Sequence, residues 1–175
     1  MKRTKKMALA GVLCALAVVF MMLGGVIPLA TFICPALAGL MLIPIFVECG
    51  EKFCYGAYVA IAALALILCA DKEAALLFAF LGYYPALRWR IEQIRGLVLR
   101  AVVKLAIFNV AIGIMYALIF FVFQMQAIIA EMQAMGIAMN IVLLLVGNVT
   151  MLLYDRMLKI FTAIYVHKLR DKLIK

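Results

Sequence analysis

The stretch from Asp71 to Lys104 constrains the fold most, because its apolar part is bounded by charge at both ends. Asp71, Lys72 and Glu73 precede an apolar segment, residues 74–89. A charge at the centre of a bilayer costs about 3 kcal/mol or more, so both charged ends must lie in water or among headgroups. The segment therefore either crosses a membrane or dips in and returns. The basic residues that follow its apolar core are Arg88, Arg90, Arg95, Arg100 and Lys104.

Composition identifies the membrane as the solvent of this chain. Hydrophobic residues make up 70% of the sequence, charged residues only 14%, and the mean hydropathy is +1.22. Soluble domains lie far from these values. The sequence thus predicts an all-α integral membrane protein, folded as a single domain over residues 1–175.

Length and charge disagree about the segment 74–89, and charge decides. About 16 residues give roughly 24 Å of helix, short of the ~30 Å hydrocarbon core, which favours a dip. A crossing places 16 of the 17 Lys and Arg residues on the side of both termini, whereas a dip places 5 on that side and 12 opposite. The positive-inside rule favours the crossing. We therefore expect a bundle of six transmembrane helices in the plasma membrane, with both termini cytoplasmic and residues 71–73 outside.

Apolar runs predict the other spans at residues 7–27, 35–47, 53–70, 101–123 and 137–161. Residues 29–34 should form an external connection, residues 48–52 a tight cytoplasmic turn, and residues 124–136 an external segment with an interfacial helix. After Pro85, apolar residues recur at helical spacing opposite arginines, which predicts an amphipathic cytoplasmic helix lying on membrane lipid or docked on a partner. These apolar residues are Leu87, Ile91, Ile94 and Val98.

The first span carries a strip of small residues. Ala10 and Cys14, and likewise Gly11 and Ala15, lie four positions apart and so share a face. Small residues let another backbone approach closely in a membrane. The strip packs either against this chain's own helices or against a partner, and the sequence leaves both open.

Motifs for chemistry are missing from the sequence. It contains no metal-binding cluster, nucleophile elbow or phosphate loop, so we expect no enzyme activity, no cofactor and no metal site. The net charge of +9 comes from basic residues that flank apolar spans, which suits anionic membrane lipid rather than nucleic acid. The five cysteines, an odd number without zinc spacing, indicate small apolar fillers.

Polar residues in the outer half of the predicted bundle are the candidate binding groups. Asn148 should lie roughly 16 Å below the outer surface, near the midplane. Taken singly, such an amide is by default a hydrogen-bonding link between helices. Taken together, neutral donors and acceptors in an apolar bundle suit a small organic molecule, held between the fourth, fifth and sixth spans. The candidate substrate-binding residues are Lys72, Glu73, Tyr84, Glu131, Asn140 and Asn148.

Six spans, a basic N-terminus and the stretch LAGVLCALAVV (residues 9–19) resemble the substrate-binding (S) components of energy-coupling factor (ECF) transporters. In that family an Ala-x-x-x-Ala strip packs on a membrane coupling subunit. Gly11 and Ala15, with Ala10 and Cys14 beside them, occupy its place here. The resemblance implies capture of a vitamin or precursor at the outer face, for uptake driven by separate ATPase subunits.

The stretch DKEAALLFAFLGYYP (residues 71–85) also resembles a family of small uncharacterised bacterial membrane proteins. That resemblance implies a layout but no activity. A non-enzymatic membrane scaffold or accessory protein therefore stands as the alternative function.

Overall fold

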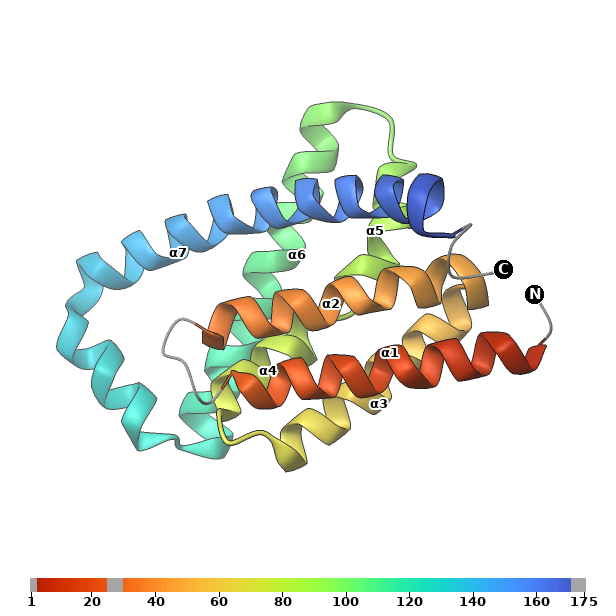
Figure 1. Ribbon diagram of the computed structural model, residues 1–175. Coiled ribbons are helices and arrows are strands. Elements are labelled where there is room, and N and C mark those ends of the chain that lie inside the picture. The colour runs from red at the N-terminus through yellow and green to blue at the C-terminus, as the bar shows by residue number, and fades with distance from the viewer. Residues whose placement is uncertain (1–2, 25–29, 171–175) are drawn as a thin grey trace. The chain divides into compact units, whose positions relative to one another are not determined.

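The computed structural model describes residues 3–24 and 30–170, and over these residues the protein is helical with no strand (Figure 1). Five helical segments are long and apolar enough to cross a membrane: residues 4–23, 31–49, 51–68, 97–123 and 128–168. The predicted all-α class is confirmed, and these segments have the length and composition that a membrane span requires. The α-helices are α1 (Arg3–Leu23), α2 (Ala30–Cys49), α3 (Glu51–Leu68), α4 (Lys72–Leu81), α5 (Tyr84–Glu92), α6 (Leu97–Leu118) and α7 (Gln126–Ile164), and π-helical turns follow α6 as η1 (Ile119–Phe123) and α7 as η2 (Tyr165–Leu169).

The chain divides into two compact units, which we describe separately. Unit 1 comprises residues 1–93 and 157–175, and unit 2 comprises residues 94–156. Unit 1 therefore contains α1 to α5 and the last part of α7. Unit 2 contains α6, η1 and the rest of α7.

Unit 1 is built around α1, α2 and α3, which pack against one another (Figure 1). Small side chains dominate its buried core, so the helix backbones can approach closely without a large side chain between them. Met21, Leu42, Ile45, Ile61 and Phe78 are also fully buried there. The small core residues are Ala17, Ala38, Cys54, Ala62, Ala65, Cys69, Ala74, Ala75 and Ala86.

One end of unit 1, which we call the Gly50 end, gathers four segments of the chain. Gly50 alone connects α2 to α3, with φ 89° and ψ 174°, a backbone conformation that is essentially restricted to glycine. The Cys49 thiol donates to the carbonyl oxygen of Lys6 in α1 at 3.5 Å. Arg90 at the end of α5 contacts Glu51 at 2.7 Å, and Arg170 after η2 contacts Glu48 at 2.9 Å. A tight turn is present within the predicted residues 48–52, although both helices extend into that range; its cytoplasmic side stays a prediction.

The opposite end of unit 1, which we call the Asp71 end, joins α2, α3 and α4. The Thr31 hydroxyl in α2 donates to the Asp71 carboxylate at 2.7 Å. Asp71 also caps α4, because its side chain accepts from the backbone N–H of Ala74 at 3.1 Å. The Lys72 ammonium donates to the carbonyl oxygen of Leu66 near the end of α3 at 2.9 Å.

Together, α4 and α5 extend along the whole length of α3. They begin at the Asp71 end, the Tyr58 hydroxyl of α3 donates to the Ala79 carbonyl on the way, and Arg90 meets Glu51 at the Gly50 end. The break between them arises at Pro85, whose missing N–H cannot continue the helix. Gly82 (φ −64°, ψ −19°) and Tyr83 (φ −75°, ψ −14°) keep right-handed helical dihedrals, so the backbone does not reverse there.

Unit 2 contains a pair of long helices, α6 and α7, joined through η1 and Gln124. Gln124 ends η1 in a left-handed conformation (φ 45°, ψ 47°). Gly136 interrupts α7 with φ 74° and ψ 167°, so residues 126–135 form a separate short helix before the long one. A short helix was predicted in the segment 124–136 and is present; its place at the membrane interface stays a prediction. An added Cβ at Gly147 would lie 3.2 Å from the Phe108 ring, so α6 and α7 approach closely there.

Three predicted segments differ from the structure, and one lies outside the described residues. α2 begins at Ala30, not Pro35, because a proline near a helix start in a membrane protein is tolerated when neighbouring helices supply partners. The apolar segment 74–89 forms two helices rather than one. The amphipathic helix is interrupted at residues 93–96, where Gly96 takes φ 102°. The predicted helix end at residues 25–28 falls outside the described residues.

Candidate functional site

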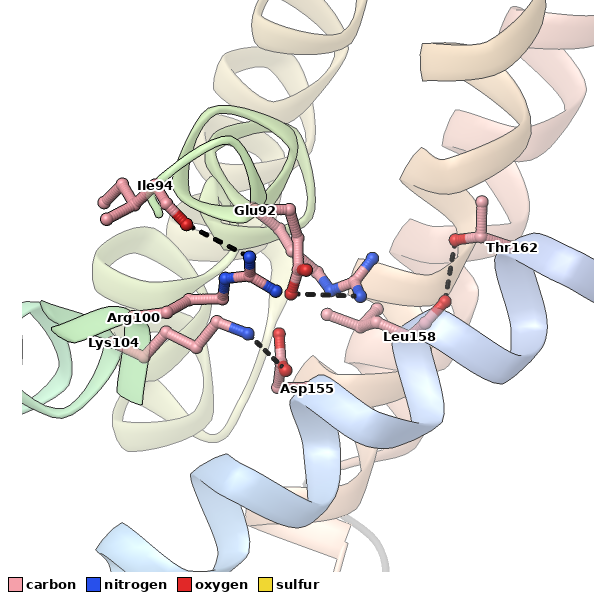
Figure 2. A network of polar contacts seen from close by, with 8 residues as sticks. Glu92, Ile94, Arg100, Lys104, Asp155, Leu158 and Thr162 are labelled. Atoms are coloured by element: carbon pink, nitrogen blue, oxygen red, sulfur yellow. Dashed lines mark hydrogen bonds and ion pairs between the residues drawn. The ribbon is translucent and has the colours of Figure 1, made fainter. Parts of the chain in front are cut away.

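A buried ion pair links α6 to α7 in unit 2. The Lys104 ammonium contacts the Asp155 carboxylate at 2.6 Å, and Figure 2 shows the two side chains pointing toward each other. Their side chains are only 7% and 16% exposed. Desolvating a single charge here would be costly, whereas an ion pair with good geometry offsets much of that cost. The pair therefore fixes which faces of α6 and α7 meet.

A reciprocal amide pair lies further along the same two helices. The Asn109 amide donates to the Asn148 oxygen at 2.7 Å, and the Asn148 amide donates back at 3.2 Å. Each amide nitrogen also donates to a backbone carbonyl four residues earlier, that of Leu105 or Leu144, at 2.8 Å. We call Lys104, Asn109, Asn148 and Asp155 the polar ladder. In it the Asn148 side chain already has partners for its oxygen and its nitrogen.

Asn140 spans the kink at Gly136. Its side-chain amide donates to the Met132 carbonyl oxygen at 2.9 Å. In an unbroken α-helix that carbonyl would accept from the backbone N–H of Gly136, four residues later. The Asn140 side-chain oxygen is buried and has no hydrogen-bond partner among the described residues. An unpaired buried acceptor of this kind is uncommon. Asn140 therefore both stabilises the kink and offers one free acceptor. Glu131, in the short helix before the kink, is exposed.

The other candidate substrate residues lie in unit 1, near or below its Asp71 end. Lys72 is exposed and bound to the Leu66 carbonyl, and Glu73 is half-buried in the first turn of α4. Tyr84 starts α5 with 1% of its surface exposed, which makes it a core residue. The six candidate residues are thus divided, three in each unit.

The Asp71 end also holds a buried thiol. Burial raises the pKa of the Cys69 thiol, while the neighbouring Lys72 lowers it and Asp71 raises it further. Because the thiolate is the reactive form, Cys69 should react slowly near neutral pH. Among the described residues, no group of three or more His, Cys, Asp or Glu side chains is arranged to hold a metal.

The small-residue strip of α1 divides into two faces. Ala10 and Cys14 are half-buried and pack against the core of unit 1. Gly11 and Ala15 are exposed, and a Cβ added at Gly11 would meet nothing within 4 Å. The two alternatives from the sequence therefore apply to different residues: one half of the strip packs internally and the other half is open. We call Gly11 and Ala15 the open strip.

Sequence reasoning missed three charged residues that are largely buried. Lys104 was counted in the basic cluster that follows the segment 74–89, and Asp155 was given no role. Glu48, whose side chain is 4% exposed, was treated as part of a turn. In antiparallel helices, Lys104 and Asp155 both lie about five to seven residues beyond the asparagine pair, a spacing that would have brought them together.

The chain has no match in a scan against protein-family models, and none among the curated proteins or the solved structures that were searched.

Proposed function

We propose that the protein is a six-span membrane protein, with α4 and α5 together forming the fourth span. Support comes from the contacts of unit 1, where this pair reaches from the Asp71 end to the Gly50 end beside the 18-residue helix α3. Eighteen helical residues cover about 27 Å, close to the hydrocarbon thickness. A broken helix at this depth is tolerated when protein surrounds it, and Phe78, Tyr84 and Ala86 are buried.

The Gly50 end would face the cytoplasm. The helix termini that lie at the Gly50 end carry most of the basic residues of unit 1, whereas the Asp71 end carries Lys72 alone. The positive-inside rule then orients the bundle, with α1 beginning inside and η2 ending inside. Basic residues at or near the Gly50 end are Lys5, Lys6, Lys52, Arg88, Arg90 and Arg170.

Within this topology, the function we propose is that of a substrate-binding subunit of an ECF-type transporter. It would capture a small organic molecule, a vitamin or precursor, from the outer face, and a membrane coupling subunit with ATPase subunits would drive uptake. The observation that carries the proposal is the open strip on α1. Gly11 and Ala15 present a smooth surface to the membrane, where a partner helix can approach closely.

The substrate would enter from the Asp71 end. Lys72 and Glu73 lie there and can meet a charge on the ligand. Tyr84 would act from the core beneath them. Glu131, Asn140 and Asn148, the candidates in unit 2, stay predictions.

The open strip can be tested by co-expressing the protein with coupling and ATPase subunits of an ECF module. We expect Gly11→Leu to abolish co-purification, because a large side chain would hold a partner backbone away, while the protein itself stays folded. Gly56→Leu is the matched control: Gly56 is exposed on α3 and also has nothing within 4 Å of an added Cβ. Capture unaffected by Gly11→Leu would contradict the proposal.

A membrane scaffold or accessory protein is the second candidate, and the polar ladder favours it. Asn109 bonds to Asn148, and Lys104 pairs with Asp155. Side chains paired in this way hold helices together rather than receive a ligand. Thermal unfolding of the purified protein in detergent separates the two functions. Stabilisation by a vitamin or precursor supports the transporter subunit, whereas indifference to a panel of such molecules supports the scaffold.

A further inference from the structure

Glu48 is a buried carboxylate whose ion-pair partner lies almost at the far end of the chain. It lies near the C-terminal end of α2, and its side chain is 4% exposed. The Nε–H of Arg170 donates to its Oε1 atom at 2.9 Å, although 122 residues separate the two. The Arg170 side chain is 49% exposed. A buried carboxylate therefore depends on a cation that is itself half in solvent.

The π-helical turn η2 places Arg170 on the same side as Tyr165. Residues five apart in a regular α-helix point about 140° apart around the axis. In η2 the backbone N–H of Arg170 bonds instead to the carbonyl of Tyr165, the i→i+5 pattern of a π-helix, which brings the two residues nearly into line. Tyr165 is 1% exposed. The π-helical turn thus brings the buried Tyr165 side chain closer to the side of the helix from which Arg170 reaches Glu48.

The Tyr165 hydroxyl is a spare donor one π-helical turn before Arg170. It is buried and has no hydrogen-bond partner within the described part of the chain. A buried hydroxyl without a partner is costly, and so is a buried carboxylate that loses its cation. If Arg170 moved away, the buried Glu48 carboxylate would lose its cation. A hydrogen bond from Tyr165 to Glu48 would then give a partner to the hydroxyl and to the carboxylate.

We propose that Glu48, Tyr165 and Arg170 form a two-position latch at the Gly50 end. In the closed position, seen here, Arg170 holds the end of α7 and η2 against α2. In the released position, Arg170 leaves to solvent and Tyr165 donates its hydroxyl hydrogen to Glu48, so the buried carboxylate keeps a partner. The latch lets the residues after Tyr165 detach at low cost, and it is independent of whether the chain transports a substrate.

Hydrogen exchange of the full-length protein in detergent tests the closed position. Arg170→Gln should speed exchange of the backbone amides at residues 166–170 by about tenfold or more, because a charge-assisted hydrogen bond no longer holds these residues. Lys159→Gln is the matched control, since Lys159 is exposed on the same helix. Unchanged exchange in Arg170→Gln would overturn the latch.

A double-mutant cycle tests the released position. Tyr165→Phe alone should change thermal stability little, and Arg170→Gln alone only modestly, because Tyr165 takes over. The double variant should lose at least about fivefold more in the folding equilibrium than the two single losses combined, because Glu48 is then buried without a partner. Adding Glu48→Gln to the double variant should restore most of that loss. Additive effects, or no rescue by Glu48→Gln, would show that Tyr165 is not the alternative donor.

Discussion

At the scale of single residues, the asparagine pair of the polar ladder decides between structural and binding roles. Asn148 was predicted both as a default link between helices and, with five other residues, as a ligand contact. The structure gives it a reciprocal partner, Asn109, and a backbone acceptor, Leu144. A ligand could use Asn148 only by displacing the Asn109 amide.

We expect Asn109→Ala, Asn148→Ala and the double variant to lose similar stability, because each removes the same interhelical pair. Such bonds in membrane bundles contribute about 1 kcal/mol, so the coupling in the cycle should be of that order. Unfolding in mixed detergent measures it. Thr150→Ala is the control, because the Thr150 hydroxyl bonds only within its own helix, to Val146. Additive losses would contradict the pair, and weaker ligand binding at unchanged stability would support the binding role.

The sequence predicted which types of residue need an interhelical partner better than it predicted which residue that partner is. Amides at membrane depth had to find partners, and this was expected of Asn148. Lys104 was assigned to the membrane surface by its position in the chain, and Asp155 was given no partner. Their burial depends on which faces of α6 and α7 meet, and that is a tertiary property which no local pattern reports.

At the scale of elements, the α4–α5 pair shows how a glycine permits a broken helix. The backbone N–H of Gly82 donates to the Phe78 carbonyl at 2.6 Å. A Cβ at Gly82 would lie 2.5 Å from that oxygen and 2.9 Å from the Phe78 ring. Phe78 is fully buried, so its ring has little room to move.

We therefore expect Gly82→Ala to destabilise the protein by about 1–3 kcal/mol through overpacking. Gly113→Ala is the matched control, because Gly113 is helical and an added Cβ there would meet nothing within 4 Å. That control should be neutral or slightly stabilising, since alanine is the better helix former. Thermal unfolding in detergent measures both. Equal stability of the two variants would mean that the backbone around Gly82 adjusts freely.

Helix boundaries were predicted well where apolar runs are long, and poorly where a proline or glycine could either break a helix or lie within it. The runs that became α1, α3 and α6 gave close boundaries because nothing inside them breaks a helix. Pro35 was taken as a start, yet it lies inside α2, and Gly96 was overlooked as a break, yet its positive φ ends the amphipathic pattern. Whether such a residue breaks or only bends a helix depends on the neighbours that supply hydrogen bonds.

At the scale of the whole molecule, the topology rests on where charge lies relative to the bundle. If α4 and α5 cross, residues 72 and 95 lie on opposite sides of the membrane. In a variant without native cysteines, Lys72→Cys should react with an impermeant maleimide in intact cells, and Arg95→Cys only after permeabilisation. Restoring the native Cys69 alone should give slow labelling, because that thiol is 1% exposed and its pKa is raised by burial. Labelling of positions 72 and 95 from the same side would refute the crossing.

The class of the molecule was readable from composition, since so apolar a chain predicts helices that are long and apolar enough to cross a membrane, and five such helices are present among the described residues. Its function was not readable to the same degree. Charge, length and hydropathy act on every residue alike and so average reliably over the chain. A binding site depends on which few polar groups remain unengaged after folding, as Asn140 does and Asn148 does not.

The buried Lys104–Asp155 pair also has a consequence for how the protein is made. The ribosome synthesises α6 well before Asp155 emerges, so Lys104, about two turns into α6, would enter the bilayer without its counter-ion. A lone lysine raises the free energy of insertion by up to about 3 kcal/mol. Insertion of α6 and α7 together as a hairpin avoids that penalty. The same ion pair that joins the finished helices thus favours delivering them to the membrane as one cotranslational unit.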